Sequence, residues 1–95
     1  MALKTTRLDL AKYLETDEDI AEFLAETARE GTEEDFIHAL GIAARARGMT
    51  EIARQAGVTR ASLYKSLSDG GNPEFGTVAK VCAALGVRLV PQPIS

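Results

Sequence analysis

The side chains best suited to chemical recognition lie in one short stretch, which combines hydroxyl groups, two cations and an aromatic ring. Between Thr59 and Lys65 they follow helical spacing around Leu63, an apolar residue that suits an inward face. Groups of this kind bind phosphate oxygens and the base edges of nucleic acids, and Thr59 at the helix start suits a backbone phosphate. The stretch predicts contacts with double-stranded DNA from Thr59, Arg60, Ala61, Ser62, Tyr64 and Lys65.

Two short helices joined by a tight turn would position this face. Apolar residues recur at helical spacing in residues 49–56, and Gly57 follows where a left-handed residue commonly ends a helix. Thr59 is a good N-cap for a second helix, in which Leu63 and Leu67, four residues apart, would face the core together. This is the pattern of a helix-turn-helix, whose second helix lies in the DNA major groove. The alternative is an ordinary helical hairpin inside an all-α domain.

The charges divide the chain into an acidic and a basic half. The net charge is −3, but residues 1–42 hold 4 Lys and Arg against 11 Asp and Glu, and residues 43–95 hold 7 against 3. Arg45 and Arg47 stand in the last turn of a predicted helix, where the helix dipole favours cations. Since the basic half carries the helix-turn-helix pattern, the charge distribution favours nucleic-acid binding more than the net charge does.

The acidic half is expected to face away from DNA and to meet a second partner. Its longest predicted helix carries acids along an outward face, with apolar residues on the other side. An apolar residue beside such acids could anchor a protein interface while the charges steer the encounter. The predicted partner-binding residues are Glu22, Phe23 and Glu26. A merely solvated helix face is the alternative.

Further helices are predicted before the helix-turn-helix. Thr16 with Asp19, and Thr32 with Asp35, have the spacing of a capping box, in which each side chain bonds the other residue's backbone N–H. A glycine follows each of the two helices that these boxes would start. Asp9 could cap a shorter helix upstream. The fold class is therefore all-α, in a single domain of residues 1–95, with acidic helices in 1–48 and a DNA-binding core in 49–95.

The C-terminal part predicts a last helix and a short extended segment. Asn72 would cap the helix, with Pro73 in its first position. The apolar residues expected to be buried along this helix are Phe75, Val78, Val81, Cys82 and Leu85. Residues 87–90 form a short β-like run that ends at Pro91. A single strand needs a partner, so either the same segment of a second copy pairs with it or it lies on the core as an extended tail.

The residue types do not indicate a catalytic site or a metal site. His38 is the one histidine and Cys82 the one cysteine, and neither has neighbours at ligand or nucleophile–base spacing. No cofactor is predicted, and no membrane-spanning run or signal peptide is recognised. The expectation is a cytoplasmic binding protein rather than an enzyme.

The chain resembles the addiction module antidote proteins, which are antitoxins with a Cro and lambda-repressor type helix-turn-helix, here of the HigA-like kind. The stretch GMTEIARQAGVTRASLYKSL, the loop with GNPEF and the helix ending ALGVRL carry the resemblance, which the upstream LAKYLETDEDIAEFLAET extends. The resemblance implies a five-helix lambda-repressor-like domain with an N-terminal helical extension. Many lambda-repressor-class proteins start this motif with a phosphate-contacting Gln. Thr50 and Glu51 stand there in this chain, and Thr50 is included among the predicted DNA contacts.

By this resemblance the chain would be a homodimeric antitoxin that binds operator DNA near its own promoter and neutralises a RelE/ParE-like toxin encoded beside it. The alternative is a stand-alone prophage-type transcriptional repressor without a toxin. A third possibility is a structural interaction module that has lost DNA binding.

Overall fold

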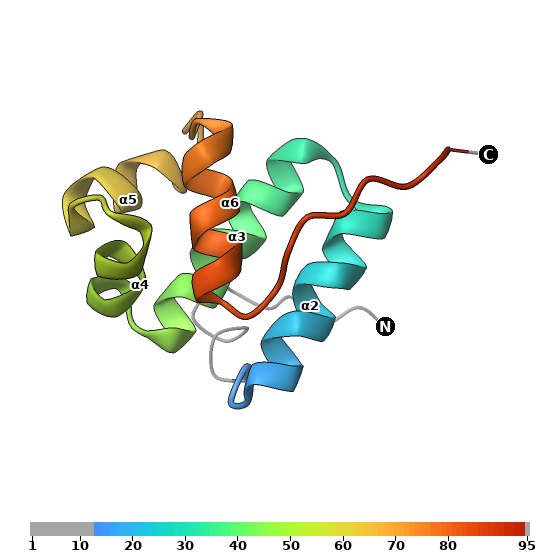
Figure 1. Cartoon of the computed structure of the whole chain (residues 1–95), viewed down its shortest axis with the longest axis horizontal. Helices are drawn as coiled ribbons and strands as arrows, with labels where there is room; N and C mark the ends of the chain where they lie inside the picture. Colours follow the sequence, from blue (N-terminus) through green and yellow to red (C-terminus); the bar gives the residue numbers. More distant parts are fainter. Residues whose placement is uncertain (1–12, 95) are drawn as a thin grey trace, which may run out of the picture.

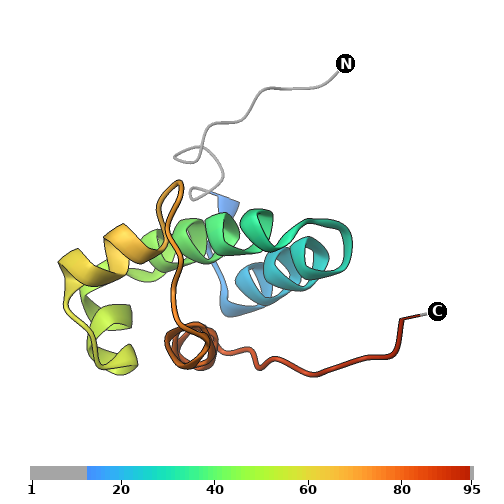
Figure 2. The ribbon, with the colours of Figure 1, turned by 90° about the horizontal axis from the view of Figure 1, so that it is seen from above.

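A computed structural model describes residues 13–94 of the protein, which form five α-helices and no strand. The helices are α2 (Asp17–Glu30), α3 (Glu33–Arg47), α4 (Met49–Ala56), α5 (Arg60–Ser66) and α6 (Phe75–Ala84). Helices α2 and α3 form a hairpin, α4 and α5 lie beside the far end of α3, and α6 crosses α3 between the two groups (Figures 1 and 2). The all-α prediction is confirmed, while the short helix expected from Asp9 lies mostly outside the described residues.

Both predicted capping boxes are present, and they set where the first two helices begin. The Thr16 hydroxyl accepts from the Asp19 N–H at 3.0 Å, and the Asp19 carboxylate accepts from the Thr16 N–H at 3.1 Å. Thr32 and Asp35 make the same pair of bonds at 3.1 and 2.9 Å. Each cap satisfies N–H groups that the helix itself leaves open, a contribution typically of about 1 kcal/mol. Local sequence therefore determines the start of α2 and of α3.

The core lies between α3 and the helices around it. It combines large apolar residues from all five helices with small ones that come mainly from α3 and α4, namely Ile20, Leu24, Ala39, Leu40, Ala43, Ala44, Ile52, Ala53, Ala56, Leu63, Val81 and Cys82. Helix α3 approaches the end of α5 closely, because a Cβ added at Gly41 would lie 3.0 Å from the Leu67 carbonyl oxygen. The small residues of α3 permit this approach, since a larger side chain would hold the two helices apart.

The turn between α4 and α5 has the predicted conformation. Gly57 is left-handed, with φ 71° and ψ 28°, a region that glycine reaches without steric cost. Its N–H donates to the Arg54 carbonyl at 3.2 Å, and the Val58 N–H donates to the Ala53 carbonyl at 3.0 Å. These bonds satisfy the last carbonyls of α4. The chain can therefore reverse within three residues and start α5 at Arg60.

The last helix begins two residues later than predicted. Glu74, in extended conformation, is the N-cap of α6, so Asn72 and Pro73 belong to the preceding loop. The burial of Phe75 was also predicted wrongly, because this side chain is 74% exposed. Val78 is half-buried, whereas Cys82 is fully buried. The apolar face of α6 was assigned correctly from Val78 onward, but Phe75 in its first turn is not part of the buried face.

The predicted β-like segment is not a strand. After Val87, whose N–H donates to the Cys82 carbonyl and closes α6, residues 88–94 run alongside α2 without regular structure (Figure 1). A strand needs unsatisfied backbone groups beside it, and the backbone groups within a helix bond to one another. The alternative of an extended tail therefore describes this segment in the structure.

Candidate functional site

The outward face of α5 rests on two buried leucines. Leu63 is fully buried and Leu67 nearly so, which turns the opposite side of the helix outward. Thr59 caps α5, since its hydroxyl oxygen accepts from the Ser62 N–H at 3.0 Å. The hydroxyl proton of Thr59 is still able to donate to an external acceptor. The residues predicted to contact DNA are all exposed, namely Thr50, Thr59, Arg60, Ala61, Ser62, Tyr64 and Lys65.

These residues come from two helices. Six of them lie on α5 or at its cap, and Thr50 lies in the first turn of α4. The structure thus brings Arg60, Tyr64 and Lys65 onto one short helix, where their side chains provide two positive charges and a ring. This set could bind phosphates and base edges, as the sequence predicted.

Charge on the neighbouring α4 is neutralised locally. The Arg54 guanidinium donates to the Glu51 carboxylate through Nε at 3.0 Å, and Gln55 donates to the same oxygen at 2.9 Å. These bonds lower the pKa of Glu51, with the bond from Arg54 contributing most, and they raise the pKa of Arg54. Among the described residues, neither Arg60 nor Lys65 pairs with a carboxylate. Of the positive charge on α4 and α5, the part that no described carboxylate compensates therefore lies on α5.

Arg45 joins this face, although the sequence pattern predicts for it only a position at the end of a helix. The carbon at the centre of its guanidinium lies 4.8 Å from the centroid of the Tyr64 ring, a cation–π distance. Eighteen residues lie between the two along the chain, so no spacing in the sequence connects them. Only the packing of α3 against α5 brings them together.

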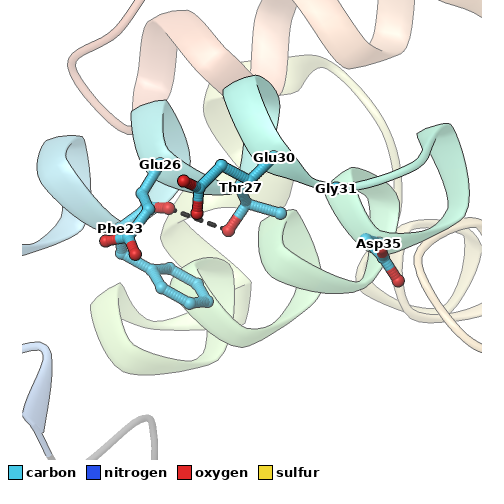
Figure 3. A pocket seen from close by; sticks show the side chains of 6 residues that line it. All are labelled: Phe23, Glu26, Thr27, Glu30, Gly31 and Asp35. Carbon is cyan, nitrogen blue, oxygen red and sulfur yellow. Dashed lines mark hydrogen bonds between the residues drawn. The ribbon is translucent and has the colours of Figure 1, made fainter.

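A second candidate surface lies on α2 and includes two of the three predicted partner-binding residues. Phe23, Glu26, Thr27, Glu30, Gly31 and Asp35 line an open hollow of about 360 Å³ (Figure 3). The Thr27 hydroxyl donates to the Phe23 carbonyl at 2.9 Å, and Asp35 serves the cap of α3. Glu26 and Glu30 thus provide negative charge beside a half-buried ring, whereas Glu22 is exposed outside the hollow.

The remaining groups capable of chemistry take part in packing. Cys82 is fully buried, and burial raises the pKa of its thiol to about 11, so the thiol stays protonated at neutral pH. His38 Nε2 lies 2.9 Å from an oxygen of Asp69, which connects α3 to the loop after α5. Within residues 13–94, no group of His, Cys, Asp and Glu could hold a metal ion. None of the helices in the same range is long and apolar enough to cross a membrane.

Comparison with known proteins finds a matching family and a similar protein. A family model described as "Probable addiction module antidote protein" matches residues 4–93. A protein of Haemophilus influenzae, described as an "Uncharacterized protein", is 46% identical over 84 residues, which cover 88% of this chain and 87% of the relative. No solved structure matches the chain significantly.

Proposed function

We propose, since the chain belongs to the family of probable addiction module antidote proteins, that it is the DNA-binding antitoxin of a toxin–antitoxin module. It binds operator DNA through a lambda-repressor-like helix-turn-helix formed by α4 and α5, and it represses its own promoter. Its second activity is to neutralise a RelE/ParE-like toxin in the cytoplasm. Family membership favours this function over that of a stand-alone prophage repressor, because an antidote implies a toxin.

The observation that carries the DNA-binding part is the exposed face of α5. Arg60 and Lys65, two cations that pair with no described carboxylate, flank Tyr64 on a helix whose opposite side is anchored in the core by Leu63. Arg60 is near the helix start, which is the end that reaches base edges in a major groove. Lys65, five residues later, would meet a phosphate. One such helix covers few base pairs, so a two-fold dimer on an inverted repeat would supply the necessary selectivity.

Replacing Arg60 or Lys65 by Ala should weaken DNA binding without unfolding the protein, because both side chains point away from the core. If a side chain contacts only phosphate, affinity should fall on every sequence and the salt dependence should drop by about one unit. If Arg60 reads a guanine, the loss should be about 1–3 kcal/mol and specific to that base pair. Mobility-shift titrations at several salt concentrations measure both effects.

The matched control is Arg29→Ala, which removes a cation from the end of α2, on the other side of the molecule from α5 (Figure 1). It should leave DNA affinity close to that of the wild type. Equal affinities for the control, the two α5 variants and the wild type would show that the recognition face is assigned wrongly.

The toxin-binding part is supported by the acidic surface of α2. The hollow beside Phe23 offers carboxylates and an aromatic ring, which together suit a cationic group of a partner. A toxin that binds RNA must attract phosphates and is therefore expected to present positive charge. Phe23 would anchor the interface, while Glu22 and Glu26 would steer the encounter.

Reversing the charge at Glu22 and Glu26 to Lys should slow association with the toxin, most visibly at low salt. The control reverses Glu15 and Glu18, which changes the net charge equally around the start of α2, outside the hollow. Stopped-flow mixing with the purified toxin measures the on-rates. On-rates that fall equally in both double variants would indicate a net-charge effect, and unchanged rates would exclude the acidic surface from toxin binding.

A further inference from the structure

Arg45 has a position that its charge alone does not explain. It lies in the last turns of α3, is partly buried, and its guanidinium lies over the ring of Tyr64. Nearby Arg47 pairs with Asp17, and Arg54 on α4 pairs with Glu51. Among the described residues, no carboxylate pairs with Arg45. Its cationic group is therefore held against an aromatic ring, with no described carboxylate to compensate its charge.

Packing in the core fixes the positions of Arg45 and Tyr64 relative to each other. One turn before Arg45, Gly41 brings α3 close to the Leu67 carbonyl at the end of α5. Leu63, which precedes Tyr64, is fully buried. Since both helices are held on either side of the contact, the arginine and the ring meet without a flexible segment between them.

We propose that Arg45 is a further DNA contact and that it acts together with Tyr64 as one unit. This inference rests on the proposed DNA-binding function and extends its surface from α4 and α5 onto α3. A guanidinium that lies over a ring uses its flat face, and its five N–H donors at the edge are still able to bond phosphate oxygens. The phosphate compensates the positive charge of Arg45. Before DNA binds, the guanidinium holds the Tyr64 ring in place. Holding it beforehand lowers the entropy lost on binding.

A double-mutant cycle tests this coupling. The wild type, Arg45→Ala, Tyr64→Ala and the double variant are titrated with a duplex of the region upstream of the gene and with an unrelated duplex, over a range of salt. Arg45→Ala should bind both duplexes on the order of tenfold more weakly, and its salt slope should fall by about 0.9. The double variant should lose less than the product of the single losses, by a factor of about three, because the contact between the two is lost only once.

A lysine variant separates a DNA contact from a structural role. Arg45→Lys keeps the charge but not the planar group, so it should retain the salt slope and weaken the coupling to Tyr64. Melting temperatures of all variants are measured alongside. If Arg45→Ala and Arg45→Lys lowered the melting temperature and the affinity in parallel, Arg45 would be structural and the inference wrong.

Two further results overturn the inference, and they differ in what else they affect. If the wild type binds the upstream duplex while Arg45→Ala binds equally well, or if the single losses multiply, Arg45 and Tyr64 do not act together on DNA. The proposed DNA-binding function then stands. If the wild type binds neither duplex at any salt concentration, the proposed DNA binding fails and this inference fails with it.

Discussion

Replacing Leu63 by Ala is expected to lower the free energy of unfolding by about 2–5 kcal/mol, the usual range for truncating a buried leucine. Leu63 is fully buried, and it is the main residue by which α5 is fixed to the core. The truncation removes apolar contacts and leaves a cavity under the helix. For a chain of 95 residues such a loss is a large fraction of the total stability. DNA binding should fall with it, because the face of α5 loses its support.

Chemical denaturation followed by circular dichroism measures the Leu63→Ala effect. The control makes the same change at Leu89, which is 40% exposed on the C-terminal tail and should cost well under half as much. Similar midpoints for the two variants would mean that α5 is not anchored through Leu63. DNA binding should be measured at a temperature where the variant is still folded, so that loss of structure and loss of contacts are separated.

Gly71→Ala is the second substitution expected to lower stability strongly. The cause is a steric clash at the end of α5. A Cβ at this position would lie 2.2 Å from the Ser66 carbonyl oxygen and 2.7 Å from that of Lys65, both of which are backbone atoms. Because the backbone of a helix end cannot rotate away as a side chain can, the loop must move. Overpacking of this kind typically costs about 1–3 kcal/mol, occasionally more. The Gly71 N–H bond to the Ser68 carbonyl, at 2.8 Å, should also be lost.

Gly76→Ala is the matched control for Gly71→Ala. The added Cβ meets nothing within 4 Å, and Gly76 lies in the first turn of α6, so this change should be neutral or slightly stabilising. Thermal unfolding of the two variants side by side measures the difference. If Gly71→Ala melted at the same temperature as Gly76→Ala, the loop would not pack against α5 as described.

Features that depend on neighbours in the chain could be predicted from the sequence. The capping boxes at Thr16 and Thr32 involve residues three apart. The left-handed conformation of Gly57 depends on the turn formed by the residues next to it. The burial of Leu63 and the exposure of Tyr64 follow from helical spacing alone. For the same reason the exposed face of α5 could be assigned as the candidate DNA-binding site before its surroundings were known.

What lies beside each element was decided by the tertiary structure. Phe75 has the spacing of a buried residue, yet its side chain is 74% exposed. Residues 87–90 have the composition of a strand, yet they lie beside a helix, which offers no backbone partner. The hollow beside Phe23 needs the start of α3 next to α2, and the contact of Arg45 with Tyr64 needs α3 against α5. Spacing along the chain determines which way a side chain points, but burial and pairing depend on atoms that packing brings from distant parts of the sequence.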